Sequence, residues 1–372
     1  MMSQTEKKIA FISAATLLLS TLEYLIPKPL PFLRLGLANL PLLIILDGMS
    51  FGPFFIILLL KAVGQGMVNG TLFSYLFLIS LAGTLSSGIA MKGAKKLLGL
   101  KVSLVGCSLL GAFVSNLSQL QVASWVAYGP SIWIAAPLML ALGMVTSFAL
   151  GLLAEIYLQR GTTGKALAQG TLSLSMPPTE EKVPHKHLLF ASLLAIVAIL
   201  LAKGLITLAV ITALMYLLQW VAGRRIRILP ALMLIFSLVV LSLFEPNGKV
   251  LFSMGTLAFT EGSLTIALTK ALRLLSLLSA SQSLSASNPK IEGKAGTLLA
   301  LTLAYFSLLT RSFRETKGSV IQRVDQALQA TASGKNTDKT SPIVHKKPIN
   351  IPLFLFIVLG VLTASLISLI VY

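Results

Sequence analysis

Charged residues are scarce in this chain, and acidic residues are scarcer than basic ones. Only 11% of the 372 residues are charged, with 12 Asp or Glu against 30 Lys or Arg, for a formal net charge of +18. A soluble domain carries about 25% charged residues. The single cysteine, Cys107, lies inside an apolar run, which excludes an intrachain disulfide and favours a small packing residue. This composition is typical of a chain buried in lipid.

Motifs for nucleotide hydrolysis and metal-dependent catalysis are missing from the sequence. The nearest approach to a phosphate-binding loop, Gly161–Lys165, has two residues between its glycines instead of four, and Ala166 replaces the required Ser or Thr. Binding a prenyl diphosphate through magnesium needs clustered carboxylates, but the aspartates are far apart: Asp47, Asp325 and Asp338. The histidines lie in predicted loops: His185, His187 and His345. We therefore expect no enzymatic activity, no catalytic residues, no metal and no cofactor.

Long apolar runs dominate what the sequence does contain. Hydrophobic residues make up 55% of the chain, and the mean hydropathy is +0.88. A helix needs about 20 mainly apolar residues to cross the hydrocarbon layer. We expect about eleven spans, at 8–26, 34–46, 52–68, 72–91, 102–121, 131–158, 188–202, 204–221, 228–244, 263–281 and 351–372. The chain is thus predicted to be an all-α polytopic protein of the cell membrane, in contact with the lipid bilayer.

Basic residues between these runs set the predicted topology. With Lys7 and Lys8 inside, the inner connections hold most of the Lys and Arg, whereas the outer connections 27–31, 69–71 and 122–130 hold only Lys28. This is the positive-inside pattern, so the charge does not require a nucleic-acid partner. Residues 161–187 form a polar, Pro-containing linker, which divides the chain into modules 1–160 and 188–372.

The region 288–350 is predicted to be the main cytoplasmic segment. Its basic residues Arg311, Arg314 and Arg323 alternate around a helix with apolar residues such as Val324 and Leu328, which gives amphipathic character. Two interpretations stay open. The helix either lies at the membrane surface or docks another protein.

Polar residues inside the predicted spans are candidates for a binding site, because lipid penalises them. In the first module we single out four that lie toward the predicted outer side: Glu23, Asn39, Asn116 and Gln119. Others are Lys61, Gln65, Asn69 and Gln121. The amides either line a pocket for a polar small molecule or tie helices together. The nearby aromatics, Trp125, Tyr128 and Trp133, fit an interfacial belt.

The run Leu22–Asn39, through Glu23, Pro27, Pro29, Gly36 and Asn39, resembles the membrane family called heptaprenyl diphosphate synthase component I, or Gx transporter family. The similarity covers residues 5–160. It implies the six-helix fold of the substrate-binding S-components of energy-coupling factor transporters, with an outward-facing pocket. The enzymatic family name implies instead a membrane subunit of isoprenoid biosynthesis, although the acidic residues for that chemistry are missing.

The second module is similar to the CbiQ-like T-component of the same transporters, through Phe259–Gly262, Arg273 and the basic amphipathic region. This resemblance implies coupling to ABC-type ATPase subunits on other chains. The family's Ala-Arg-Gly or Ala-Arg-Ser motifs are replaced by Thr310–Ser312 and Thr316–Gly318, and Arg311 and Arg314 are the candidate coupling residues.

Small residues on the first helix offer a contact between the modules. Ala10 and Ala14 lie one turn apart, and such spacing lets another helix approach closely. S-components use a face of this kind to meet the T-component, and packing within the module is the alternative. We interpret the chain as a fused S- and T-component of an importer for a small organic micronutrient. The alternatives are an isoprenoid-biosynthesis subunit and a transporter that works without ATPases.

Overall fold

The structure is a computed structural model that describes residues 3–24, 36–160, 166, 174–177, 186–224, 226, 228–254, 257–286, 293–334 and 351–371. We refer to residues 4–160 as the N-terminal module. Its elements are α1 (Gln4–Tyr24), η1 (Leu37–Asn39), α2 (Leu40–Ile44), α3 (Phe51–Asn69), α4 (Tyr75–Leu98), η2 (Gly99–Lys101), α5 (Leu104–Ala123), η3 (Ser124–Tyr128), η4 (Pro130–Ala135) and α6 (Ala136–Arg160). Apart from the short η segments, these are α-helices.

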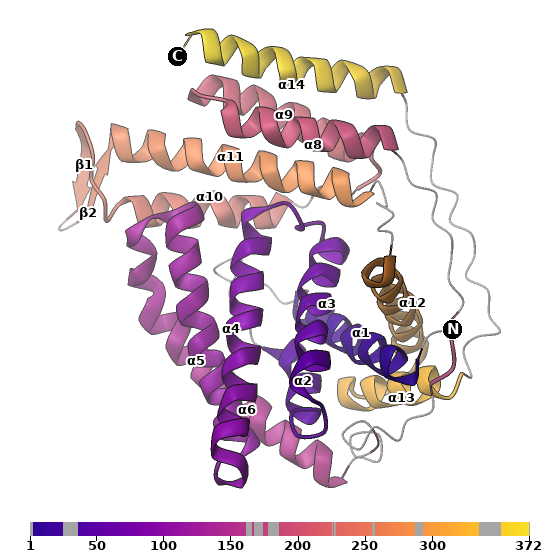
Figure 1. Ribbon diagram of the computed structural model, residues 1–372. Helices are drawn as coiled ribbons and strands as arrows, with labels where there is room; N and C mark the ends of the chain where they lie inside the picture. Colours follow the sequence, from indigo (N-terminus) through magenta and orange to yellow (C-terminus); the bar gives the residue numbers. More distant parts are fainter. Residues whose placement is uncertain are drawn as a thin grey trace.

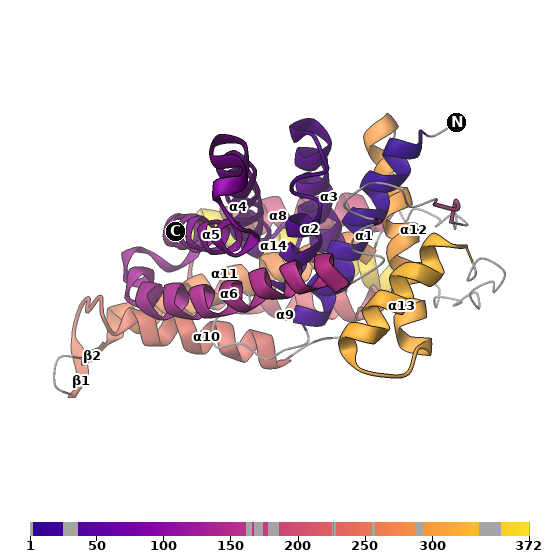
Figure 2. The same cartoon turned by 90° about the horizontal axis from the view of Figure 1, so that it is seen from below.

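The C-terminal module comprises residues 186–371. Its elements are α8 (Lys186–Leu201), α9 (Leu205–Val221), α10 (Ile228–Ser242), β1 (Val250–Met254), β2 (Leu257–Thr260), α11 (Glu261–Ala286), α12 (Gly293–Glu315), α13 (Val320–Ala332) and α14 (Ile351–Val371). The long helices of this module, α8 to α11 and α14, run in a common direction, and α3, α4 and α5 of the N-terminal module cross that direction (Figure 1). In the second view α10 and α11 keep their direction, while α5 is seen nearly end-on (Figure 2).

The apolar helices confirm that the chain is a multi-pass membrane protein. Among the described residues, five helices are long and apolar enough to cross a membrane: Phe51–Asn69, Tyr75–Leu98, Pro130–Gln159, Glu261–Ser285 and Gly293–Glu315. Four shorter apolar helices are Leu189–Leu201, Leu205–Val221, Ile228–Ser242 and Phe356–Val371. Large apolar side chains point outward, with Ile206 78%, Phe236 69% and Ile370 83% exposed. Lipid is the solvent that such surfaces require.

The expected span 34–46 is not a spanning helix. Residues 25–35 lie outside the described part of the chain, and after them Gly36, with φ 88°, leads into the short η1. Helix α2 has five residues with Pro41 in its first turn, which is far too short to cross a bilayer at about 1.5 Å per residue. The ammonium of Lys92, on α4, donates to the carbonyl oxygens of Leu46 and Met49 and holds the turn that follows α2.

Two elements of the C-terminal module also differ from the expected arrangement. Strands β1 and β2 form an antiparallel hairpin, with Val250 opposite Thr260 and Met254 opposite Leu257, where the sequence predicted only a turn. Helix α12, predicted to be cytoplasmic, has the length and composition of a spanning helix. Its apolar residues Leu301 and Tyr305 are buried in one cluster with residues of α1 and α13, so packing inside the protein accounts for that composition.

Among the described residues, the two modules meet in two main regions. In the first, apolar residues at one end of α4, α5 and α6 pack with α10 and α11, in a cluster that includes Tyr75, Leu120, Leu238 and Leu274. Tyr128 is 2% exposed in this cluster, and burial raises the pKa of its phenol. Tyr128 is therefore buried between the modules and not exposed in an interfacial belt, whereas Trp125 is 75% exposed.

Hydrogen bonds reinforce this first interface. A carboxylate oxygen of Glu245 accepts from the Ser131 amide at 2.8 Å, and the amide of Phe73 donates to the hydroxyl of Ser281 at 2.9 Å. These contacts lie near opposite ends of α11, so the N-terminal module lies along the whole helix. The second interface is formed by α1 against α12 and α13.

Candidate functional site

A polar cavity lies inside the N-terminal module, between α1, η1, α3, α4, α5 and α6. It encloses about 1080 Å³ of space between its atoms, including space open to solvent. All four predicted binding residues, Glu23, Asn39, Asn116 and Gln119, line it. Fifteen of the 23 described residues that line the cavity carry polar side chains.

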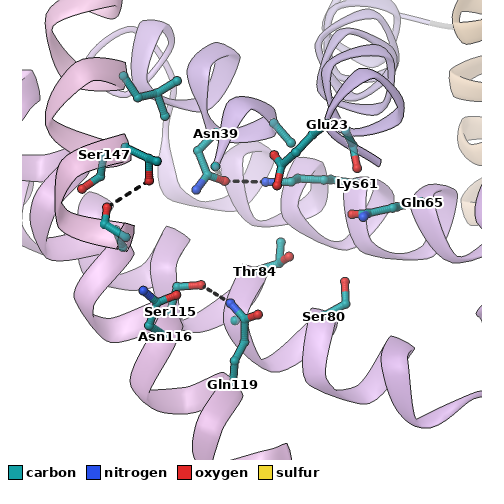
Figure 3. A pocket seen from close by; sticks show the side chains of 18 of the residues that line it. Glu23, Asn39, Lys61, Gln65, Ser80, Thr84, Ser115, Asn116, Gln119 and Ser147 are labelled. Atoms are coloured by element: carbon teal, nitrogen blue, oxygen red, sulfur yellow. Dashed lines mark hydrogen bonds between the residues drawn. The ribbon is translucent and has the colours of Figure 1, made fainter. Parts of the chain in front are cut away.

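One wall of the cavity carries its charged groups. The Lys61 ammonium, on α3, donates to Oδ1 of Asn39 at 2.5 Å, and Figure 3 shows the Glu23 carboxylate turned toward the same ammonium. Lys61 is 2% and Glu23 4% exposed. A buried charge is tolerated when an opposite charge and hydrogen bonds compensate it. Glu23, Asn39 and Lys61 therefore form one polar unit contributed by α1, η1 and α3.

The opposite wall is built from the amides of α5. Asn116 Nδ2 donates to the Met139 carbonyl at 2.9 Å, and Gln119 Nε2 donates to the Ser115 hydroxyl at 2.8 Å. Glycines on the neighbouring helices make room for these side chains. A Cβ at Gly83 would stand 2.5 Å from Gln119 Nε2, and one at Gly143 would collide with Asn116 Nδ2.

Several buried polar atoms that line the cavity have no hydrogen-bond partner. They are Oε1 of Gln65, Oγ1 of Thr84 and Oε1 of Gln119. Their side chains point into the space between the helices (Figure 3). Leaving a buried acceptor unpaired costs about 1 to 3 kcal/mol, so a guest molecule or a water that donates a hydrogen bond to these atoms would be favoured.

Comparisons with known families divide the chain in a similar way. Residues 12–157 match the model of the family heptaprenyl diphosphate synthase component I. That range contains every described residue that lines the cavity. A second family model, described as a domain of unknown function (DUF8519), matches residues 185–284, from α8 to the end of α11. No curated protein and no solved structure gives a significant match. The resemblance of the C-terminal module to a T-component stays a prediction.

The four residues singled out from the sequence leave out several others that the fold brings to the cavity, although Lys61, Gln65 and Asn69 were among the further polar candidates. Lys61 is the most informative of these, since it is the one charged residue of α3 and the cost of placing an ammonium in an apolar helix was a usable signal. Gln65 follows it one turn later on the same face. Thr84 gave no such signal, because Ser and Thr are common in membrane helices, where they bond to their own backbone.

The predicted intermodule residues of α1 lie at the second interface. Ala10 and Ala14 are both 0% exposed and share a cluster with Tyr305 and Leu309 of α12. The Phe11 ring meets the Tyr305 ring edge-on, with centroids 5.6 Å apart. The small side chains let α12 lie close to α1, as the spacing requires.

The predicted coupling residues lie near the turn between α12 and α13. Arg311 forms an ion pair with Glu315 at 3.0 Å, while Arg314 is exposed. Beside them, Val320 and Ile321 are 60% and 63% exposed. The turn is held from inside by Arg323, whose guanidinium donates to the Phe313 carbonyl at 2.7 and 3.1 Å. The exposed surface thus combines basic and apolar groups on a turn that the hydrogen bonds of Arg323 hold in place.

Proposed function

We propose that this chain is the membrane component of an energy-coupling factor-type importer for a small organic micronutrient in the cell membrane. The N-terminal module binds the substrate, and the C-terminal module couples it to ATPase subunits supplied by other chains. The observation that carries the proposal is the polar cavity enclosed by α1 to α6, within the range that matches one membrane family. Polar cavities inside membrane helices are costly and mark substrate sites.

The helix pair α12–α13 supports the coupling role. It contacts α1 through a tightly packed face and exposes Arg314, Val320 and Ile321 at its turn. Such a surface offers an acidic or apolar partner both charge and apolar contact. A movement of an attached subunit would therefore reach α1, which carries Glu23 of the cavity, through direct helix contact.

The alternative, a membrane subunit associated with isoprenoid biosynthesis, rests on the family description. A prenyl chain needs a continuous apolar channel, whereas 15 of the 23 described residues that line the cavity carry polar side chains. Among the described residues there is also no group of three or more His, Cys, Asp or Glu side chains that could hold a metal ion. The chemistry of the cavity fits a hydrophilic solute better.

The deciding experiment measures uptake in membrane vesicles. Small molecules that copurify with the chain are identified by mass spectrometry, and their labelled forms are offered to vesicles with and without ATP. We expect uptake that depends on both the chain and ATP hydrolysis. Uptake that persists after ATP depletion would point to an ATPase-independent transporter, and prenyl diphosphate synthesis dependent on the chain would support the alternative.

A further inference from the structure

The charges and unpartnered atoms of the cavity point to a class of ligand, an inference that rests on the cavity being the substrate site of the proposed importer. We propose that it binds a small non-aromatic zwitterion of the amino-acid class, carrying one ammonium and one carboxylate.

The charge balance favours a ligand with no net charge. Glu23 and Lys61 are the ionisable groups among the described residues that line the cavity, and their charges cancel. A ligand with a net charge would add an uncompensated charge in a region of low dielectric constant, which is costly. A zwitterion instead offers its ammonium to Glu23 and its carboxylate to Lys61. In an α-amino acid these groups are attached to one carbon, so they match two protein charges that lie side by side (Figure 3).

The unpartnered acceptor atoms of the cavity lining favour a ligand with hydrogen-bond donors. Oε1 of Gln65 and of Gln119 can only accept, and both are buried without a donor. An ammonium carries three N–H donors, so one that meets Glu23 has donors left for an amide oxygen. Thr84, 5% exposed and also unpartnered, can pair with a polar side chain of the ligand.

The rest of the lining argues against two other classes. No Phe, Tyr or Trp side chain is found among the described residues that line the cavity, so a flat ring compound would lack the stacking partners that such ligands use. The apolar lining is limited to Ala38, Leu76, Met91, Ala112 and Leu150 besides three glycines. Among these only Leu76, Met91 and Leu150 have long apolar side chains, and polar side chains surround them, so a prenyl chain would meet no continuous apolar channel.

Thermal unfolding of the purified full-length chain tests the proposal with matched probes. The probe sets are the standard amino acids, α-hydroxy acids such as lactate and glycerate, amines such as ethanolamine, and polyols such as glycerol. We expect Tm to rise with concentration for at least one non-aromatic amino acid, and not for its hydroxy-acid or amine counterpart. Stabilisation by another set and not by the amino acids, or by none of the sets, would overturn the proposal.

Changing one charge should change the preference and not only the affinity. In Glu23→Gln the cavity keeps one positive charge, so the affinity for the hydroxy acid relative to that for the amino acid should rise roughly tenfold or more. In Lys61→Met the cavity keeps one negative charge, so the affinity for the amine relative to that for the amino acid should rise. Thr84→Val, which preserves shape, should weaken amino-acid binding by roughly fivefold or more. Ser86→Ala is the matched control, because this hydroxyl on α4 bonds to Ser118 outside the cavity. Unchanged preference in folded charge variants would overturn the proposal.

These measurements separate the ligand class from the transport mechanism. Amino-acid binding without ATP-dependent uptake would leave the ligand class standing and remove the proposed importer. ATP-dependent uptake of a ring compound, with no binding of amino acids, would support the proposed importer and overturn the ligand class.

Discussion

The hydroxyl of Tyr157, near the end of α6, donates a hydrogen bond of 2.5 Å to Oδ1 of Asp325 in α13. The other carboxylate oxygen accepts from Nε2 of Gln329 at 3.0 Å. The bond between Tyr157 and Asp325 ties α6, the last helix of the N-terminal module, to the helix pair α12–α13, which carries the candidate coupling surface. It lies at the opposite end of α6 from the contact between Ser131 and Glu245, so the N-terminal module is held at two distant points.

Removing the Tyr157 hydroxyl should loosen α13 without unfolding the protein. We expect Tyr157→Phe to speed amide hydrogen exchange in α13 and to cost about 1 kcal/mol of local stability, because one partly buried hydrogen bond is lost. Hydrogen exchange followed by mass spectrometry measures this effect. Tyr216→Phe in α9 is the control, and equal exchange in α13 for both variants would show that the bond has no stabilising role.

Enlarging the small residues of α1 should disrupt its contact with α12. Ala10→Leu and Ala14→Leu add side-chain volume where no exposed surface remains, and overpacking costs about 1 to 3 kcal/mol. We expect a lower Tm for both variants in detergent. Ala209→Leu, at an exposed position of α9, is the matched control and should leave Tm nearly unchanged. If all three variants unfold alike, the close approach of α12 does not contribute to stability.

Reversing the basic residues at the end of α12 should weaken binding of ATPase subunits. Arg311→Glu with Arg314→Glu is expected to reduce copurification of these subunits while ligand affinity stays as in the wild type, since both residues lie outside the cavity. The same reversal at exposed Lys101, between α4 and α5, is the control. Undiminished copurification in the double variant would exclude this turn as the docking site.

Truncating the amides of the cavity should weaken ligand binding. Asn39→Ala removes the acceptor of the Lys61 ammonium, and Asn116→Ala removes the bond to Met139. A lost buried hydrogen bond costs about 1 to 3 kcal/mol, so affinity should fall roughly 5- to 150-fold. Glu23→Ala and Gln119→Ala belong to the same series. Titration of the purified protein with its copurified ligand measures the effect, and changes within about twofold for all four would mean that these groups only tie helices together.

Membrane topology can be read with accessibility tags. Tags inserted in 161–181 and 333–339 should report the cytoplasm, because both stretches are polar and lie within longer segments of net positive charge, which stay on that side. A tag in the β1–β2 hairpin should report the outside, since the hairpin precedes α11 at its predicted outer end. An external signal from a tag in 161–181 or in 333–339 would contradict the arrangement of two modules with a cytoplasmic linker.

Composition and periodicity predicted the membrane class, most helices and four residues of the cavity, because a polar side chain in an apolar run is conspicuous. They failed where distant contacts decide the local structure. The segment after Gly36 is apolar enough to be a span, but Pro41 favours a helix start at that point, and Lys92 holds the carbonyls of Leu46 and Met49 in the turn that follows the five residues of α2. The apolar content of α12 serves contact with α1, and Tyr128 is buried by α10 and α11. Neither partner can be read from the neighbouring sequence.

The crossing of the two helix sets has a geometric consequence for how the chain meets its bilayer. A single membrane normal cannot run along α8, α9, α11 and α14 and also along α3, α4 and α5 (Figure 1). When one set stands upright between the two aqueous phases, the other lies flat at a single depth. If the C-terminal module stood upright, α3, α4 and α5 would lie in the plane of the bilayer, and the polar cavity between them would lie there with them.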